Sequence, residues 1–160
     1  MNTSPWQTAE QTYRAIGRFI FEFSQLEYAI RHYVAEEARI EEKFFNAIMT
    51  HDFARLCTGA IDVFRESIPS EERFKRMEAL LKRAKGLGDD RNRVAHGLWV
   101  PFVEGGKIFH VPSNLKQKVS TDQVTVLEGK ADLACELRAN IEACALDMEW
   151  MQHQVSKSGA

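Results

Sequence analysis

The strongest constraint on the fold is a pair of long segments in which apolar residues return every three or four positions. The first runs from Thr8 to about Ala38, and the second runs from about Gln123 to the end of the sequence. An α-helix places such residues on one face, so both segments are predicted to be long amphipathic helices. The predicted buried stripes are Ile16, Ile20, Phe23, Ile30 and Val34 in the first, and Leu133, Leu137, Ile141, Cys144, Met148, Met151 and Val155 in the second.

A second helical region is predicted from Phe44 to about Glu66. A kink is expected near its centre, where Thr50 or Asp52 would cap a new helical start. The side chains of such residues accept hydrogen bonds from the free N–H groups of a first helical turn. This region is therefore predicted as two short helical pieces.

A third helix is predicted to begin at Pro69-Ser70, with two glutamates in its first turn. Its predicted buried side consists of Phe74, Met77, Leu80, Leu81 and Ala84. The tripeptide Gly86-Leu87-Gly88 predicts a short break in this helix. Asp89 or Asp90 would then cap the piece that follows.

The pattern changes after Gly97. Leu98–Val103 and Lys107–Val111 are β-prone runs separated by Glu104-Gly105-Gly106, which predicts a β-hairpin at about residues 98–112. A capping box at Ser120–Gln123 is expected to start the last helix. The predicted fold class is all-α: a helical bundle of four to five helices, with a small β-hairpin inserted before the last helix.

Composition sets limits on this bundle. With 160 residues, of which 44% are hydrophobic, the chain can bury one core, so a single domain over residues 1–160 is predicted. The net charge of −2 counts against a general nucleic-acid-coating role more than against an enzyme with a small cleft, and it requires any RNA contact to be local. No apolar run is long enough to cross a membrane, and the three cysteines (Cys57, Cys135 and Cys144) lack CxxC spacing. A soluble, cytoplasmic protein is expected.

One short segment holds the residues of this sequence that are best suited to catalysis. Arg91-Asn92-Arg93-Val94-Ala95-His96, followed by Gly97, places a guanidinium, an amide and an imidazole at a predicted helix end. Asn92 and His96 are four positions apart and share a helical face, whereas Arg91 and His96 lie about 140° apart around the axis. Arg is a permanent cation and His exchanges protons near neutral pH, so this pair suits the cleavage of a phosphodiester.

The motif resembles the Arg-x4-6-His motif of the HEPN superfamily, in which a polar residue follows the Arg. The segment Phe23–Ile30, with its Leu26-Glu27 pair, is similar to the first helix of many HEPN proteins. The resemblance covers roughly residues 8–97 and 120–155. Many HEPN domains are metal-independent endoribonucleases of toxin–antitoxin and phage-defence systems. The resemblance implies Arg91 and His96 as the catalytic pair and Asn92 as their polar support.

The resemblance also implies partners. A homodimer would line one cleft with the motifs of both chains, RNA would be the substrate, and an antitoxin protein is a candidate partner. Some toxins of the superfamily carry a Tyr, used as a modification site, two residues after the His. This chain has Leu98 there, so that form of regulation is not implied.

Three further residues are supporting or substrate-binding candidates. Glu27 lies on the first apolar stripe, so a buried carboxylate there needs a partner. The partner would be Arg91 or Arg93 at the site or a cation in a structural ion pair; alternatively, Glu27 lies at the edge of the stripe in water. Arg93 would be a second phosphate contact or a surface residue. Trp99, with Phe102, would stack a base beside the cleft or cover the core. No pair of residues has metal-ligand spacing, so no metal and no cofactor are expected.

The sequence therefore predicts a metal-independent endoribonuclease. The alternatives from other classes are a non-catalytic domain that binds a nucleotide or a partner protein, and a degenerate relative that only dimerises.

Overall fold

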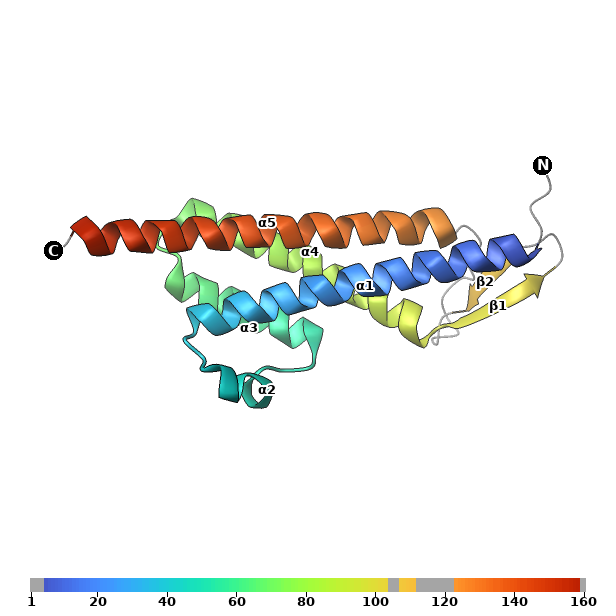
Figure 1. The fold of residues 1–160 in the computed structure, drawn as a ribbon, viewed down its shortest axis with the longest axis horizontal. Coiled ribbons are helices and arrows are strands. Elements are labelled where there is room, and N and C mark those ends of the chain that lie inside the picture. The colour runs from blue at the N-terminus through green and yellow to red at the C-terminus, as the bar shows by residue number, and fades with distance from the viewer. Residues whose placement is uncertain (1–4, 104–106, 112–122, 159–160) are drawn as a thin grey trace. The chain divides into compact units, whose positions relative to one another are not determined.

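The computed structural model describes residues 5–103, 107–111 and 123–158. Within these residues the elements follow the order α1, η1, α2, α3, α4, β1, β2, α5 (Figure 1). The predicted all-α bundle with a small antiparallel hairpin before the last helix is confirmed. None of the described helices combines the length and the apolar character that a membrane crossing requires. The predicted cytoplasmic location stays a prediction.

Helix α1 spans Pro5–Glu37, close to the predicted range. Three of the five predicted stripe residues, Phe23, Ile30 and Val34, are buried. Ile16 and Ile20 are only half-buried, because the preceding residues at 15 and 19 take the buried positions. The neighbouring positions are apolar too, so the periodicity defines a wide face and tertiary packing decides its centre. The stripe of buried residues, spaced by three and four, is Thr12, Ala15, Phe19, Phe23, Leu26, Ile30 and Val34.

The predicted second helical region is divided as expected. A 3-10 helix η1 (Glu42–Phe44) and a short helix α2 (Phe45–Ile48) precede α3 (Phe53–Ser67). The Asp52 side chain caps α3 by accepting a hydrogen bond of 3.0 Å from the backbone N–H of Arg55. Of the two capping residues considered, Asp52 is the one that acts.

Helix α4 spans Glu71–His96 without interruption, so the predicted break at Gly86-Leu87-Gly88 is wrong. Leu87 and Gly88 are buried, and this packing outweighs the cost of about 1 kcal/mol that each glycine adds to a helix interior. The motif therefore lies at the end of one continuous helix rather than on a separate short one. The predicted buried side of α4 is confirmed, since Phe74, Met77, Leu80, Leu81 and Ala84 are all buried.

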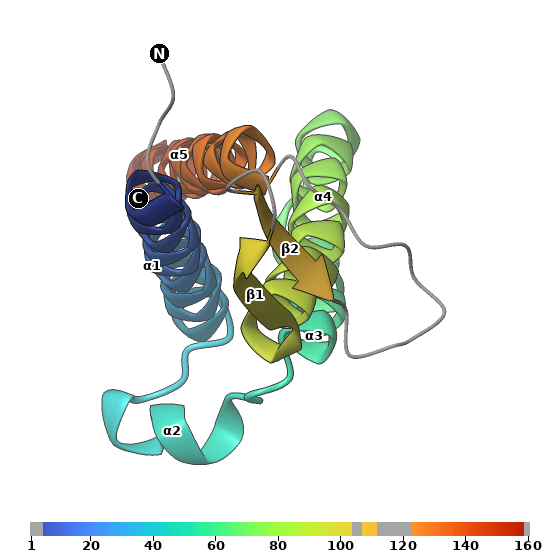
Figure 2. The same cartoon turned by 90° about the vertical axis from the view of Figure 1, so that its right-hand side faces the viewer.

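Strand β1 (Leu98–Val103) follows α4 directly and pairs with β2 (Lys107–Val111), as predicted. Figure 2 shows the two strands side by side. Trp99 lies opposite His110, and a bulge between Val100 and Val103 shifts the register. The predicted turn at residues 104–106 lies outside the described residues.

Helix α5 spans Gln123–Ser158. Leu137, Ile141 and Cys144 are buried as predicted, and Leu133 is half-buried. The capping-box residues 120–122 lie outside the described residues, as do the side chains of Met148, Met151 and Val155.

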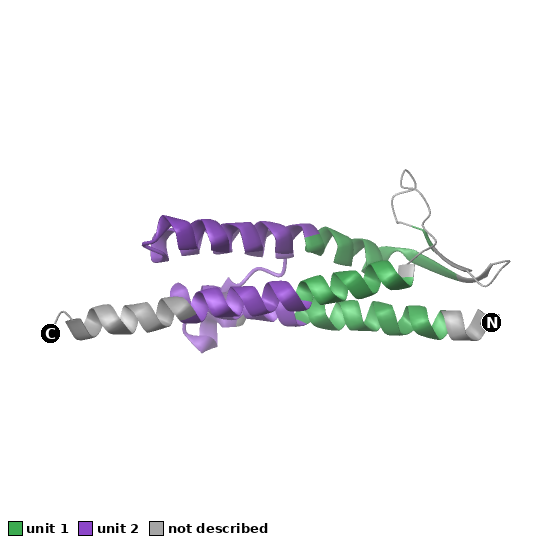
Figure 3. Cartoon of the chain, turned by 90° about the horizontal axis from the view of Figure 1, so that it is seen from above, with its two compact units in different colours: residues 1–24, 87–134 green, residues 25–86, 135–160 purple. Residues whose placement is uncertain are grey.

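The contacts group the chain into two compact units, one made of residues 1–24 and 87–134 and the other of residues 25–86 and 135–160 (Figure 3). In the first unit, Arg18 on α1 pairs with Glu128 and Asp132 on α5. In the second unit, Arg83 on α4 pairs with Glu136 on α5 at 3.3 Å. The expectation of a single domain stays a prediction.

Candidate functional site

The last turns of α4, in the first unit, carry the four polar residues of the motif, Arg91, Asn92, Arg93 and His96. Asn92, Arg93 and His96 are exposed, and Arg91 is half-buried. Val94, between them, is 7% exposed and packs inward. One buried side chain therefore holds this end of α4 against the unit, and the polar motif residues face outward around it.

The Arg91 guanidinium is held in place by two neighbours. Its Nη1 donates a hydrogen bond of 2.9 Å to Oδ1 of Asn92. Its Cζ lies 5.4 Å from the centre of the Phe23 ring, a cation–π arrangement with a side chain that is only 1% exposed. Because Phe23 is fixed in the core, the cation has a defined position at the edge of the helix.

Asn92 thus contacts Arg91. Its expected role toward His96 stays a prediction. The exposed His96 imidazole forms no hydrogen bond or ion pair within the described part of the chain. A ring in that situation is accessible to a ligand from solvent.

The hairpin caps the end of α4 with two ring N–H groups. Nε1 of Trp99 donates a hydrogen bond of 3.0 Å to the carbonyl oxygen of Val94. Nε2 of His110 lies 3.0 Å from the carbonyl oxygen of Arg93, and since a carbonyl only accepts, this nitrogen carries the proton. Carbonyl groups in the last turn of a helix lack helical partners or share them, so these contacts stabilise the helix end. The centroids of the Trp99 and His110 rings lie 4.5 Å apart.

Gly97 is required at this point for space. A Cβ there would lie 1.9 Å from Nε2 of His110 and 2.8 Å from the carbonyl oxygen of Arg93. The backbone of Gly97 does not adopt the left-handed conformation of the usual helix-ending glycine. The absence of a side chain at Gly97 therefore allows the His110 imidazole to approach the helix end.

Arg93 pairs with Asp90, one turn earlier, and Asp90 also pairs with Lys130 on α5. The carboxylate between two cations ties α4 to α5 and partly neutralises the basic character of the motif. The role of Arg93 as a second phosphate contact stays a prediction.

Glu27 belongs to the second unit. Its carboxylate pairs with Arg31 at 2.6 Å, and the two side chains are 16% and 15% exposed. The expectation that this carboxylate needs a partner is met by Arg31, while its pairing with Arg91 or Arg93 stays a prediction. Leu26, rather than Glu27, occupies the slot on the buried stripe between Phe23 and Ile30.

His110 is the residue that sequence reasoning missed. It lies far from the motif along the chain, but the strand register brings it opposite Trp99 and so to the end of α4. Trp99 lies beside the motif with its indole N–H donating to α4, and its expected role in stacking a base stays a prediction. The side chain of Phe102 lies outside the described residues. Among the residues that the structure describes, no group of three His, Cys, Asp or Glu could hold a metal ion.

No family model matches this chain, and no curated protein or solved structure is significantly similar to it. Membership of the HEPN superfamily therefore stays a prediction that rests on the motif.

Proposed function

We propose that the chain is a metal-independent endoribonuclease that acts as a homodimer. The observation that carries the proposal is the end of α4, where an exposed imidazole and a positioned guanidinium lie within two helical turns of each other. The cation is positioned by a core aromatic ring, and the helix end is capped by two ring N–H groups of the hairpin. Positioned charges stabilise a transition state better than mobile ones.

In the proposed reaction the 2′-oxygen of the substrate attacks the adjacent phosphorus, and the bond from phosphorus to the 5′-oxygen breaks. The products are a 2′,3′-cyclic phosphate and a 5′-hydroxyl end. His96 takes the proton from the 2′-hydroxyl or gives one to the leaving 5′-oxygen. Such acid–base catalysis contributes about 10²–10⁴-fold. Arg91 stabilises the negative charge on the phosphoryl oxygens, and Asn92 holds Arg91.

The reaction needs both a base and an acid, and among the described residues one chain offers a single exposed His at this helix end. A second copy of the chain would supply the other proton-transfer group. Exposed apolar side chains in the first unit support an interface: Tyr13 and Phe21 are each 60% exposed, and Leu98, next to the motif, is 63% exposed. A homodimer contact that covers them would remove these apolar side chains from water.

The test is cleavage of labelled RNA in the presence of EDTA, with analysis of the product ends. The wild type is expected to produce cyclic-phosphate ends. Arg91→Ala and His96→Ala are each expected to lose activity by at least about 100-fold. The matched controls are Arg76→Ala, which changes an exposed arginine on the same helix, and His51→Ala, which changes an exposed histidine.

Equal cleavage by wild type and His96→Ala, or a requirement for magnesium, would contradict the proposal. Binding of a nucleotide without any turnover would instead favour the non-catalytic alternative. The toxin or phage-defence setting, with an antitoxin partner, is supported by the motif resemblance. It predicts that expression of the wild type, but not of His96→Ala, arrests bacterial growth.

A further inference from the structure

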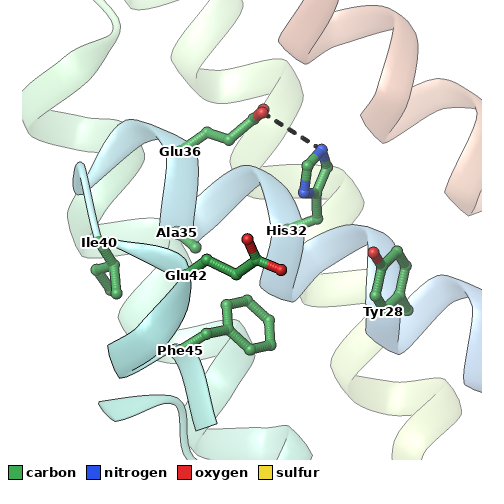
Figure 4. Close-up of a pocket in the computed structure, with 7 residues that line it drawn as sticks. All are labelled: Tyr28, His32, Ala35, Glu36, Ile40, Glu42 and Phe45. Atoms are coloured by element: carbon green, nitrogen blue, oxygen red, sulfur yellow. Dashed lines mark ion pairs between the residues drawn. The ribbon is translucent and has the colours of Figure 1, made fainter. Parts of the chain in front are cut away.

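A cavity of about 630 Å³ lies in the second unit, between the last turns of α1 and the η1–α2 segment (Figure 4). Its size is in the range of small-molecule sites, which is about 300–1,000 Å³. Tyr28 and Phe45 contribute aromatic rings, and Ala35 and Ile40 contribute aliphatic surface. All of these residues belong to the second unit, whereas the motif at the end of α4 belongs to the first.

Two carboxylates stand among the polar groups of the cavity, which also include the His32 imidazole and the Tyr28 hydroxyl. Glu36 and Glu42 both line it, and Figure 4 shows the Glu42 carboxylate extending between His32 and Phe45. None of the described residues that line the cavity is Lys or Arg. Lys43 is adjacent in sequence, but its ammonium contacts the Glu41 carboxylate at 2.6 Å and the Phe44 ring at 4.9 Å, away from the lining. A phosphate or another anion would therefore be repelled.

One of the two carboxylates, that of Glu36, has the His32 imidazole as a neighbour, and both side chains are about half-exposed. Nε2 of His32 lies 3.4 Å from Oε1 of Glu36, and the His32 ring is parallel to the Tyr28 ring, with centroids 6.1 Å apart. These contacts arrange an aromatic wall and a carboxylate along one side of α1. On the opposite side of the cavity, the η1–α2 segment also provides an aromatic ring, that of Phe45, and a carboxylate, that of Glu42.

We propose that this cavity binds an organic cation that carries a guanidinium or ammonium group. Aromatic faces attract such cations through the ring quadrupole. A planar guanidinium can in addition donate two parallel hydrogen bonds to a carboxylate. Two kinds of ligand could supply this cationic group: a free small amine, or a peptide that carries an arginine or lysine side chain.

The test is a titration of the full chain, followed by NMR of the aromatic signals of Tyr28 and Phe45. The probes are agmatine, a capped Leu-Arg-Leu tripeptide, and the same tripeptide with citrulline, the neutral analogue of arginine. Agmatine and the arginine peptide are expected to produce saturable shifts, and the citrulline peptide none. A free amine as the source predicts comparable affinities for the first two probes, and a peptide source predicts tighter binding of the tripeptide.

Matched variants separate this site from a general charge effect. Glu42→Gln and Phe45→Ala are each expected to weaken binding about fivefold, which corresponds to about 1 kcal/mol. Glu41→Gln and Phe44→Ala make the same chemical changes one position away, outside the lining, and are expected to leave the affinity unchanged. Equal binding of the citrulline peptide, equal effects of Glu41→Gln and Glu42→Gln, or no saturable shift would overturn the proposal. None of these results depends on ribonuclease activity.

Discussion

Gly97 and His110 are in such close contact that a β-carbon on Gly97 would lie 1.9 Å from the imidazole Nε2. The imidazole is there because its Nε2–H donates to the carbonyl oxygen of Arg93, which also accepts the backbone N–H of Gly97. One carbonyl oxygen therefore joins the end of α4 to the second strand of the hairpin. His110 is 7% exposed, so the contact is protected from water.

We expect Gly97→Ala to lower the free energy of unfolding by about 1–3 kcal/mol, the usual cost of forcing extra atoms into a packed region. Gly86→Ala is the matched control. Gly86 lies inside α4, and a Cβ added there would have no other atom within 4 Å. That change should stabilise the chain by about 0.5–1 kcal/mol, since alanine is the better helix former. Denaturant unfolding of both variants measures the difference, and effects of the same sign would contradict the contact.

The hydrogen bond of His110 predicts a difference between two substitutions at that position. His110→Gln keeps an N–H donor, whereas His110→Leu removes it. We expect the leucine variant to lose about 1 kcal/mol more stability, the typical net value of one hydrogen bond. Because the His110 and Trp99 rings are in contact, the leucine variant should also shift the indole N–H signal of Trp99 in an NMR spectrum. Identical behaviour of the two variants would show that the donor is unimportant.

The Glu27–Arg31 pair predicts an effect of burial on an ion pair. Glu27→Gln removes the carboxylate that pairs with Arg31, whose side chain is only 15% exposed, and we expect a loss of about 2 kcal/mol in the free energy of unfolding. The control is Glu10→Gln, because Glu10 and Arg14 form a pair with the same spacing on the same helix, at 62% and 77% exposure. An exposed pair contributes about 0–1 kcal/mol, so this variant should change little. Thermal or denaturant unfolding compares them, and equal losses would contradict the role of burial.

The Cys57 thiol predicts a pH dependence. Burial raises its pKa from the ordinary 9.0 to about 12; the Lys85 charge opposes this shift and the Glu27 charge adds to it. In the unfolded chain the thiol loses its proton near pH 9, but in the folded chain it keeps the proton up to about pH 12. Its contribution to stability should therefore be complete below pH 9 and fall by about 1.4 kcal/mol per pH unit above it.

Other groups titrate in the same range, so the measurement is the difference between wild type and Cys57→Ala. The wild type should lose stability more steeply between pH 9 and 12. Parallel pH profiles would show that the thiol is not protected. A thiol reagent at pH 8 should also modify the half-buried Cys135 before Cys57.

The helices and the hairpin were predictable because each depends on local pattern. The stripe of α4 from Phe74 to Ala84, the Asp52 cap and the limits of both strands follow from periodicity and turn residues. The glycines at 86 and 88 misled the prediction of α4, since their local preference was outweighed by the burial of Leu87. Such competition is decided by tertiary packing, which a local pattern does not contain.

The role of His110 could not be predicted from the pattern. Counting outward from the pair Val103–Lys107 would place Trp99 opposite Val111. The bulge shifts the register by one residue, so His110 lies opposite Trp99 instead. Likewise, the motif identified Arg91 as a cation, but its contact with Phe23 joins residues 68 positions apart and appears only in the fold.

The continuity of α4 has a consequence for the angular phase of the motif. Each residue of a helix advances about 100° around the axis, so the direction of His96 is set by the number of residues that separate it from the buried Leu87. One alanine inserted between Leu87 and Arg91 would turn the whole motif by about 100° and move Arg91 away from Phe23, whereas four inserted residues would restore the original direction to within about 40°. The count of residues in this segment is therefore as much a requirement of the site as the identity of its side chains.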